Sequence, residues 1–142
     1  MILIGFKSAG KTTLGKKVAE ALHRPFIDTD DLFEAPPREL YNKLGEVQFR
    51  DLEKLLIRKL QVTGHVIATG GGVPLDPDNQ SFLRALGTVI FLNTPKEVIT
   101  DRQPRFLEQY EERLGIYRSM AHHVIQTESE LWEVIRLDPF SA

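Results

Sequence analysis

The chain opens with the stretch Met1-Ile-Leu-Ile-Gly-Phe-Lys-Ser-Ala-Gly-Lys-Thr-Thr13, and this stretch decides the fold. Apolar residues 1–4 predict a buried strand, and the Gly-x-x-x-x-Gly-Lys-Thr spacing over residues 5–12 is the P-loop pattern. Apolar residues at helical spacing then predict a helix over about 11–22. Strand, glycine-rich turn and helix in this order are the setting in which a P-loop binds nucleotide phosphates.

The residue types of the loop explain its chemistry. Gly5 and Gly10 allow a sharp turn and bring backbone N–H groups close to phosphate oxygens. Lys11 supplies a point charge for the β- and γ-phosphates, which makes it a candidate catalytic residue, and the Thr12 hydroxyl is a ligand for Mg²⁺. We therefore expect a site for ATP built from Gly5, Ser8, Ala9, Gly10, Lys11, Thr12 and Thr13.

Length and composition restrict the class of protein. The 142 residues fit one domain spanning 1–142, and 42% hydrophobic with 27% charged residues is typical of a soluble globular chain. A net charge of −2 without a block of like charge argues against a nucleic-acid partner and against a membrane partner. We expect a monomer. The absence of cysteine, of a long apolar stretch and of a signal-peptide layout favours a cytoplasmic protein.

Apolar runs of strand length alternate with helical patterns along the chain. The predicted strands are Met1–Gly5, Pro25–Asp28, His65–Thr69, Thr88–Leu92 and Val124–Ile125. The predicted helices are Lys11–Leu22, Val47–Val62, Ser81–Leu86, Pro95–Arg102, Tyr110–Ala121 and Glu130–Leu137. The alternation predicts an α/β fold of the P-loop NTPase type, with three layers (α/β/α) and a central parallel sheet of about five strands. We expect the strand order 2-3-1-4-5 and ligands beyond the carboxyl ends of the strands.

Two carboxylates follow the second predicted strand. Asp28 and Asp30 point to the same side as the chain leaves the sheet, because side chains alternate along a strand. One can hold a Mg²⁺-bound water, and the other can accept a proton from an attacking hydroxyl. Alternatively, Asp30 and Asp31 cap a helix that begins near Leu32. The two carboxylates alone leave these alternatives open.

Two further motifs concern the second substrate. Arg50 and Glu53 share one helix face, either as an exposed ion pair or as a guanidinium held by a carboxylate to grip a substrate carboxylate with two hydrogen bonds. Gly70, Gly71 and Gly72 follow the third predicted strand. Three successive glycines favour close approach of a substrate to backbone N–H groups, although a flexible loop is the simpler alternative.

Taken together, these motifs resemble those of the shikimate kinase family in order and spacing along nearly the whole chain. The matching residues are Gly5 to Thr12, Asp28 to Asp30, Phe49, Arg50, Glu53, Gly70 to Gly72, Arg113, Tyr117 and Ala121. The resemblance implies ATP-dependent phosphorylation of the 3-hydroxyl of shikimate, a step of chorismate and aromatic amino-acid biosynthesis.

The resemblance also implies roles for individual residues. Asp30 matches the residue that binds the shikimate hydroxyls and serves as candidate base. Arg50 and Arg113 match the carboxylate grips, and the Gly70–Gly72 loop, centred on Gly71, matches a backbone contact to the substrate. Asp28 matches the residue that holds Mg²⁺ through water, beside Thr12.

The chain departs from the family pattern in two segments. The lid, expected at about residues 102–109, is shorter than in the family. Within it, Arg105 is the best match to the catalytic arginine that reaches the transferred phosphate, and Arg102 to the arginine that stacks on adenine. After Gln126, the stretch that borders adenine in the family is replaced by residues 127–130, which lead directly into a helix.

Two alternative functions remain open at this point. A related P-loop kinase, such as a gluconate kinase, is disfavoured by Arg50 and by the three glycines. A nucleotide-binding homologue with reduced transfer activity is compatible with the shortened lid, but has little use for both Asp28 and Asp30.

Several conspicuous residues have simpler interpretations. His122 and His123 could form a metal-binding pair, but a structural or solvated role is expected, since neighbouring residues of a strand point to opposite faces. Trp132 is expected in the core. Pro36-Pro37 is expected only to end the turn after Glu34.

Overall fold

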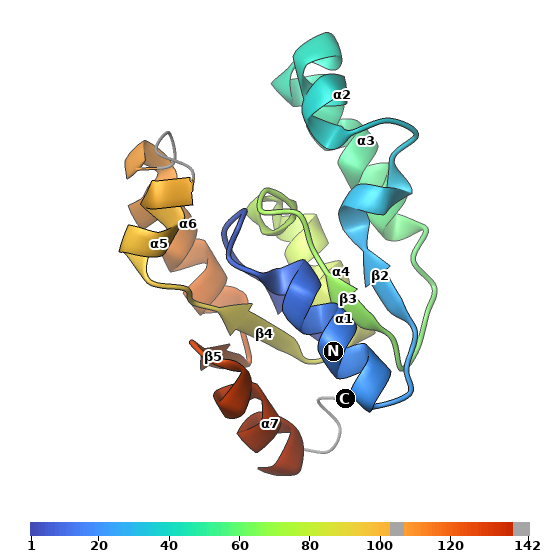
Figure 1. Cartoon of the computed structure of the whole chain (residues 1–142). Coiled ribbons are helices and arrows are strands. Elements are labelled where there is room, and N and C mark those ends of the chain that lie inside the picture. The colour runs from blue at the N-terminus through green and yellow to red at the C-terminus, as the bar shows by residue number, and fades with distance from the viewer. Residues whose placement is uncertain (103–106, 138–142) are drawn as a thin grey trace.

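A five-stranded parallel sheet forms the centre of the molecule (Figure 1). The structure is a computed structural model that describes residues 1–102 and 107–137, with side chains for all of these except 100–102, 107 and 108. The strands are β1 (Ile2–Ile4), β2 (Phe26–Asp28), β3 (Val66–Ala68), β4 (Val89–Leu92) and β5 (His123–Ile125). Their order across the sheet is β2-β3-β1-β4-β5, which confirms the predicted parallel sheet and its strand order.

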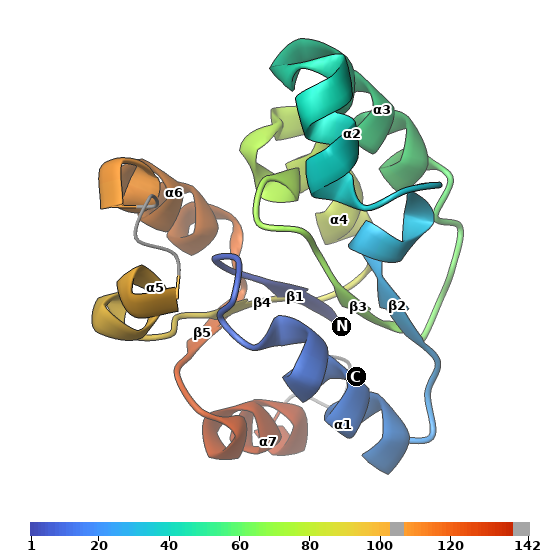
Figure 2. The same ribbon diagram turned by 45° about the horizontal axis from the view of Figure 1, so that its top comes forward.

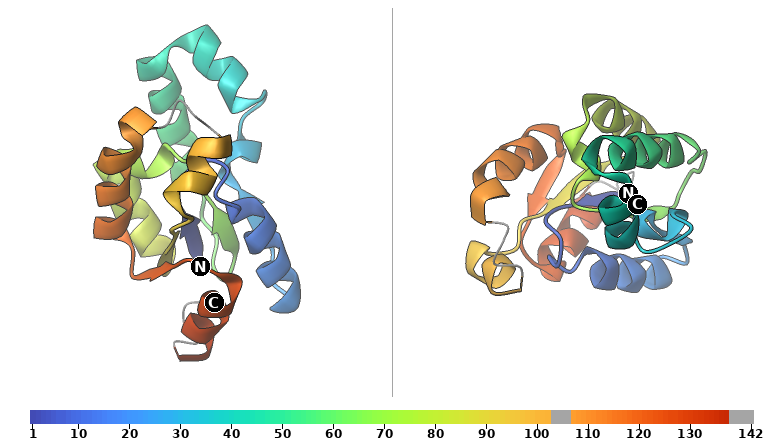
Figure 3. Two further views of the ribbon diagram at one scale, coloured as in Figure 1. Left: turned by 60° about the vertical axis from the view of Figure 1, so that its left-hand side comes forward. Right: turned by 90° about the horizontal axis from the view of Figure 1, so that it is seen from above.

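Helices cover both faces of this sheet, as the three-layer prediction requires. The α-helices are α1 (Lys11–Ala21), α2 (Pro37–Leu44), α3 (Glu46–Arg58), α4 (Pro77–Leu86), α5 (Lys96–Arg102), α6 (Leu107–Met120) and α7 (Glu128–Leu137). Two short 3₁₀ helices, η1 (Thr29–Leu32) and η2 (Val73–Leu75), follow β2 and β3. Figure 2 shows α1 and α7 on one face and α3, α4 and α6 on the other. Figure 3 (left) shows α2 at the end of the molecule opposite α7.

The core is built around β1, which lies in the middle of the sheet. Leu3 pairs with Ala68 of β3 on one side and with Ile90 of β4 on the other, and it is completely buried. A central strand covered by helices on both faces is apolar at every position, which is why residues 1–4 read as one continuous hydrophobic run. This rigid centre holds the loops that emerge at its carboxyl edge.

Helices α2 and α4 differ from the prediction in ways that their first residues explain. The expectation that Pro36-Pro37 merely ends a turn is wrong, because Pro37 is the first residue of α2. Proline is favoured there, since the first turn of a helix needs no N–H donor from it. Helix α4 begins at Pro77 rather than near residue 81, because the Asp76 carboxylate accepts a hydrogen bond from the backbone N–H of Asp78 (2.7 Å) and caps the helix.

Polar contacts at the end of α6 tie it to its neighbours. Arg84 of α4 donates to the backbone carbonyls of Met120 (3.0 Å) and Ser119 (2.9 Å), which satisfies the last turn of α6. Nδ1 of His122 accepts a hydrogen bond from the backbone N–H of Val89 (2.9 Å), so His122 is structural, as expected.

Trp132 is half-buried against the core. None of the helices in the described part of the chain combines the length and hydrophobicity needed to cross a membrane.

Candidate active site

The P-loop connects β1 to α1 at the carboxyl edge of the sheet. Gly10, directly before the helix, has a φ of 99°, a left-handed conformation that glycine adopts without strain. Ser8 has a φ of 67°, although it carries a side chain. The loop is therefore held in a tight, partly strained turn whose N–H groups and helix start are arranged for an anion.

Lys11 closes this turn from within. Its Nζ donates hydrogen bonds to the carbonyls of Gly5 (2.7 Å) and Phe6 (2.6 Å), and the side chain is buried. Burial lowers the pKa of Lys11 to about 8, although the carboxylates of Asp30 and Asp28 oppose this shift. The lysine thus fixes the loop and keeps a positive group beside the place of the phosphates.

Thr12 and Asp28 meet beside the loop. The Thr12 hydroxyl donates to Oδ2 of Asp28 (2.7 Å), while Oδ1 of Asp28 accepts from the backbone N–H of Asp30 (2.9 Å). Asp28 therefore caps η1, so the capping role belongs to this residue and not to Asp30 or Asp31. A hydroxyl and a carboxylate oxygen side by side next to a phosphate site are ligands that suit Mg²⁺, which prefers oxygen.

A first cavity of about 330 Å³ lies above the P-loop. Its lining consists of Lys7, Ser8, Gly10, Lys11, Thr12, Thr13, Asp28, Asp30, Thr69, Gly70 and Gly71. Most of the expected nucleotide residues are among them. Gly5 and Ala9 lie outside this lining, and their carbonyls accept hydrogen bonds from Lys11 and from the Thr94 hydroxyl (2.8 Å).

A second cavity of about 500 Å³ adjoins the first and is lined by α2, α3, the Gly70–Gly72 loop and α6. Its lining consists of Lys7, Asp30, Pro37, Arg38, Tyr41, Asn42, Phe49, Arg50, Glu53, Gly70, Gly71, Gly72, Gln109 and Arg113. The structure thus brings the expected substrate residues together from segments that are far apart in sequence.

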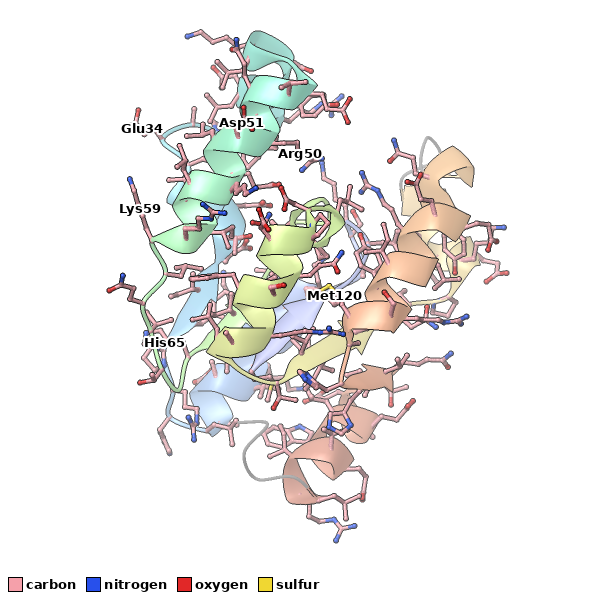
Figure 4. All side chains as sticks on the ribbon, turned by 180° about the vertical axis from the view of Figure 1, so that it is seen from behind. Glu34, Arg50, Asp51, Lys59, His65 and Met120 are labelled. Atoms are coloured by element: carbon pink, nitrogen blue, oxygen red, sulfur yellow. The ribbon has the colours of Figure 1, made fainter. Side chains whose placement is uncertain are left out.

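Arg50 is the main cationic group on the α3 side of this second cavity. It donates to Oε1 of Glu53 (2.9 Å), and Figure 4 shows it on the side of α3 that faces α6. Glu53 is only 4% exposed, and burial raises its pKa even though the guanidinium opposes the shift. The pair is therefore not an exposed surface ion pair. It is a guanidinium held in one orientation by a buried carboxylate at the edge of the second cavity.

Aromatic rings support the guanidinium of Arg50. The Phe49 ring lies 5.3 Å from it and the Tyr41 ring 6.0 Å, and Phe33 stacks on Phe49 at 5.2 Å between ring centres. The Tyr41 and Phe49 rings form an apolar wall at the α2–α3 end of the cavity. A flat wall beside a carboxylate-binding group suits a small ring bearing an acid function.

The Gly70–Gly72 loop has glycines because other groups lie against its backbone. The Gly70 N–H donates to the Thr29 hydroxyl (2.8 Å), and the Tyr117 hydroxyl donates to the Gly71 carbonyl (2.6 Å). A Cβ added to Gly72 would overlap the guanidinium of Arg50. Burial raises the pKa of Tyr117 to about 12, so this hydroxyl stays protonated and keeps donating. The loop is fixed rather than flexible.

Asp30 lies where the two cavities meet. Burial and the neighbouring Asp28 carboxylate raise its pKa, whereas Lys11 and Lys7 oppose the shift. A carboxylate with a raised pKa is a better proton acceptor than an ordinary aspartate. Its place and its basicity fit a base for a hydroxyl in the second cavity.

Parts of the predicted lid are outside the described residues. These include Arg105 and the side chain of Arg102, so their expected roles stay predictions from the sequence. Gln109, at the end of the expected lid, lines the second cavity. Beyond Gln126, α7 begins at Glu128, which forms an ion pair with Lys17 of α1 (2.9 Å).

Comparisons with known proteins match this arrangement. A family model described as shikimate kinase matches residues 7–136. The chain belongs to the shikimate kinase family. The shikimate kinase of Desulforudis audaxviator is 43% identical over 136 residues, covering 82% of this chain and 72% of that protein. The shikimate kinase of Caldanaerobacter subterraneus is 40% identical over an alignment of 154 positions, covering 94% of this chain and 90% of that protein.

Solved structures of the family superpose closely on this chain. Shikimate kinase from Acinetobacter baumannii, in complex with shikimate, has a TM-score of 0.83 at 32% identity and covers 96% of this chain and 92% of its own. A gluconokinase from Sinorhizobium meliloti has a TM-score of 0.56 at 19% identity over 97% of this chain and 92% of its own. The second likeness shows a shared P-loop kinase fold only.

Several residues that line the two cavities were not identified from the sequence. Lys7 occupies a position of the P-loop pattern that specifies no residue type, so it carried no signal. Arg38, Tyr41 and Asn42 come from α2, which was not predicted. Pro37 at the first helical position and Gly45 after the last are start and stop signals that could have revealed this helix.

Proposed function

We propose that the protein transfers the γ-phosphoryl group of ATP to the 3-hydroxyl of shikimate, with ATP in the first cavity and shikimate in the second. Family membership supports an ATP-dependent transferase of the chorismate and aromatic amino-acid pathway. The single observation that carries the assignment of the two cavities is the position of Asp30, which lines both.

The charges of the two cavities support this orientation of substrates. Arg50 and Arg113 line only the second cavity. If they bind the carboxylate of shikimate, the opposite side of its ring faces the junction of the two cavities. The 3-hydroxyl would then lie beside Asp30, and Asp30 would accept its proton as the new oxygen–phosphorus bond forms. The Gly71 N–H borders the same substrate.

Lys11 and the P-loop N–H groups would hold the β- and γ-phosphates. When bound between Thr12, Asp28 and the phosphates, Mg²⁺ would neutralise negative charge on the nucleotide. The Thr12–Asp28 pair fits such an ion because Mg²⁺ usually takes one or two protein oxygens and completes its shell with phosphates and water. We expect the protein to work as a cytoplasmic monomer.

A panel of acceptors tests the proposal. ADP release is measured in a coupled assay with ATP and shikimate, gluconate or quinate, and the phosphorylated product is identified by ³¹P NMR. Shikimate should support turnover far better than gluconate. The Lys11→Ala variant controls for contaminating kinase. Equal or greater turnover with gluconate would overturn the substrate assignment, and ADP release without a phosphorylated acid would indicate ATP hydrolysis only.

A further inference from the structure

Of the described residues, four line both cavities, and two of these four carry charge. The four are Lys7, Asp30, Gly70 and Gly71. The glycines offer backbone only, so the charged groups at the junction are one carboxylate and one ammonium. A phosphoryl group that moves from the first cavity to the second has to pass between these groups.

The backbone places Lys7 firmly at this junction. A Cβ added to Gly71 would lie 3.2 Å from the backbone nitrogen of Lys7, so the P-loop and the acceptor-side loop touch at this point. The Lys7 side chain is exposed, unlike that of Lys11, whose amine is bound by two carbonyls inside the loop. Lys7 therefore presents its charge to the open space between the cavities, whereas Lys11 lines the first cavity alone.

Lys7 lies on the same junction as the proposed base, since Lys7 and Asp30 both line the two cavities. Arg50 and Arg113 line the second cavity alone, so a substrate carboxylate has its partners away from the junction. Lys7 is thus placed for the reacting end of the substrates and not for the acid end.

We infer that the Lys7 ammonium contacts the transferring phosphoryl group and stabilises its negative charge in the transition state. This role rests on the proposed function. The bond between the γ-phosphorus and the bridging oxygen of ADP breaks, the bond from the shikimate 3-oxygen to phosphorus forms, and the hydroxyl proton goes to Asp30. Lys7 exchanges no proton in this step, and its fixed charge acts on the equatorial oxygens of the phosphoryl group.

Three variants test this role. Lys7→Met removes the charge and keeps the length of the side chain, Lys7→Arg keeps the charge, and Lys16→Met is the matched control on an exposed part of α1. Lys7→Met should lower kcat by roughly tenfold or more with little change in either KM, since a charge acting in the transition state raises kcat. Lys7→Arg should restore most of the activity, and Lys16→Met should behave as the wild type.

A further readout separates a catalytic from a structural effect. Binding of ADP with aluminium fluoride and shikimate, an analogue of the transition state, should weaken by about the same factor as kcat, whereas binding of ADP alone should not.

The outcomes distinguish this inference from the proposed function. If the wild type phosphorylates shikimate and Lys7→Met matches Lys16→Met in kcat, the inference is wrong and the function stands. A rise in the shikimate KM alone would also overturn it, because Lys7 would then bind the acceptor only. A wild type that does not phosphorylate shikimate contradicts the function itself.

Discussion

The two cavities of the active site are built in opposite ways. The nucleotide cavity takes much of its lining from one continuous stretch, residues 7–13, and its geometry comes from backbone conformation and one buried lysine. The acceptor cavity draws on α2, α3, α6 and the Gly70–Gly72 loop, and its geometry comes from side chains that position one another. Phosphate recognition is therefore local in sequence, whereas recognition of the acid is assembled by the fold.

This difference teaches where specificity resides. A loop of N–H groups at a helix start binds any polyphosphate of the right size, since backbone groups are the same in every protein. A guanidinium fixed by a buried carboxylate and an aromatic wall selects one shape of partner. Substitutions on the nucleotide side should affect transfer with every acceptor, and those on the acceptor side should discriminate among substrates.

The largest effect is expected for Lys11→Ala. Removing the charge beside the phosphates should lower kcat by on the order of a thousandfold, because this charge acts on the transferring group. Turnover with saturating substrates measures the loss, and circular dichroism checks that the fold is retained despite the two lost hydrogen bonds. Turnover close to that of the wild type would disprove the P-loop assignment.

Asp30→Asn, at the boundary of the two cavities, should have the next largest effect. Asparagine keeps the shape but cannot accept a proton, so kcat should fall by roughly a hundredfold while the ATP KM changes little. The base must be deprotonated, so activity should fall as pH is lowered through the pKa of Asp30. Because this pKa is raised, the loss in the wild type should begin at a higher pH than for an ordinary aspartate. A pH–rate profile of both proteins tests this, and an unchanged acid limb in Asp30→Asn contradicts the assignment of the base.

Arg50→Lys should affect the acceptor side alone. An ammonium cannot form the two parallel hydrogen bonds of a guanidinium, so the shikimate KM should rise by roughly ten- to a hundredfold. The ATP KM should stay close to the wild-type value. Equal rises in both Michaelis constants would mean that Arg50 supports the structure through Glu53 and does not bind the acid.

The smallest expected effects concern backbone strain at two positions, one before α1 and one after it. Ser8 (φ 67°) in the P-loop and His23 (φ 54°) after α1 both adopt the left-handed conformation. Glycine at either position should stabilise the protein by up to about 1 kcal/mol, partly offset by the greater freedom of glycine in the unfolded chain. Chemical denaturation measures the gain.

His23→Gly serves as the control, since its position completes the C-terminal turn of α1, where Arg24 N–H bonds to the Ala19 carbonyl (2.9 Å). His23→Gly should leave kcat unchanged, whereas Ser8→Gly should change it if the strained turn positions the phosphates. Equal kcat values for both variants would show that the strain at Ser8 has no part in transfer.

The same contrast explains how much could be predicted from sequence. The P-loop, the parallel sheet and the strand order followed from contiguous patterns, because a central strand and a phosphate-binding loop are each formed by residues that are neighbours in the sequence. Arg50, Gly71 and Arg113 were placed through resemblance to a family, since no local pattern shows that α3 and α6 face each other.

Other features could not be predicted for physical reasons. Helix α2 spans only 8 residues and none of them is buried, so the sequence offers few apolar positions there and the end signals mark the helix best. The importance of Lys7 depends on the contact between two loops far apart in sequence. The capping role of Asp28 depends on the path of the backbone, which brings the N–H of Asp30 to the Asp28 carboxylate.

The buried position of Lys11 has a consequence for the proton balance of nucleotide binding. With a pKa of about 8 in the ligand-free protein, part of this amine is neutral at mildly alkaline pH. Phosphate anions favour its charged form, so ATP binding should take up protons from solution near pH 8. Affinity gained through this charge is complete below that pH and is lost as pH rises through the higher pKa of the complex. Titration calorimetry in buffers of different ionisation enthalpy would then show that protons are taken up from the buffer when ATP binds.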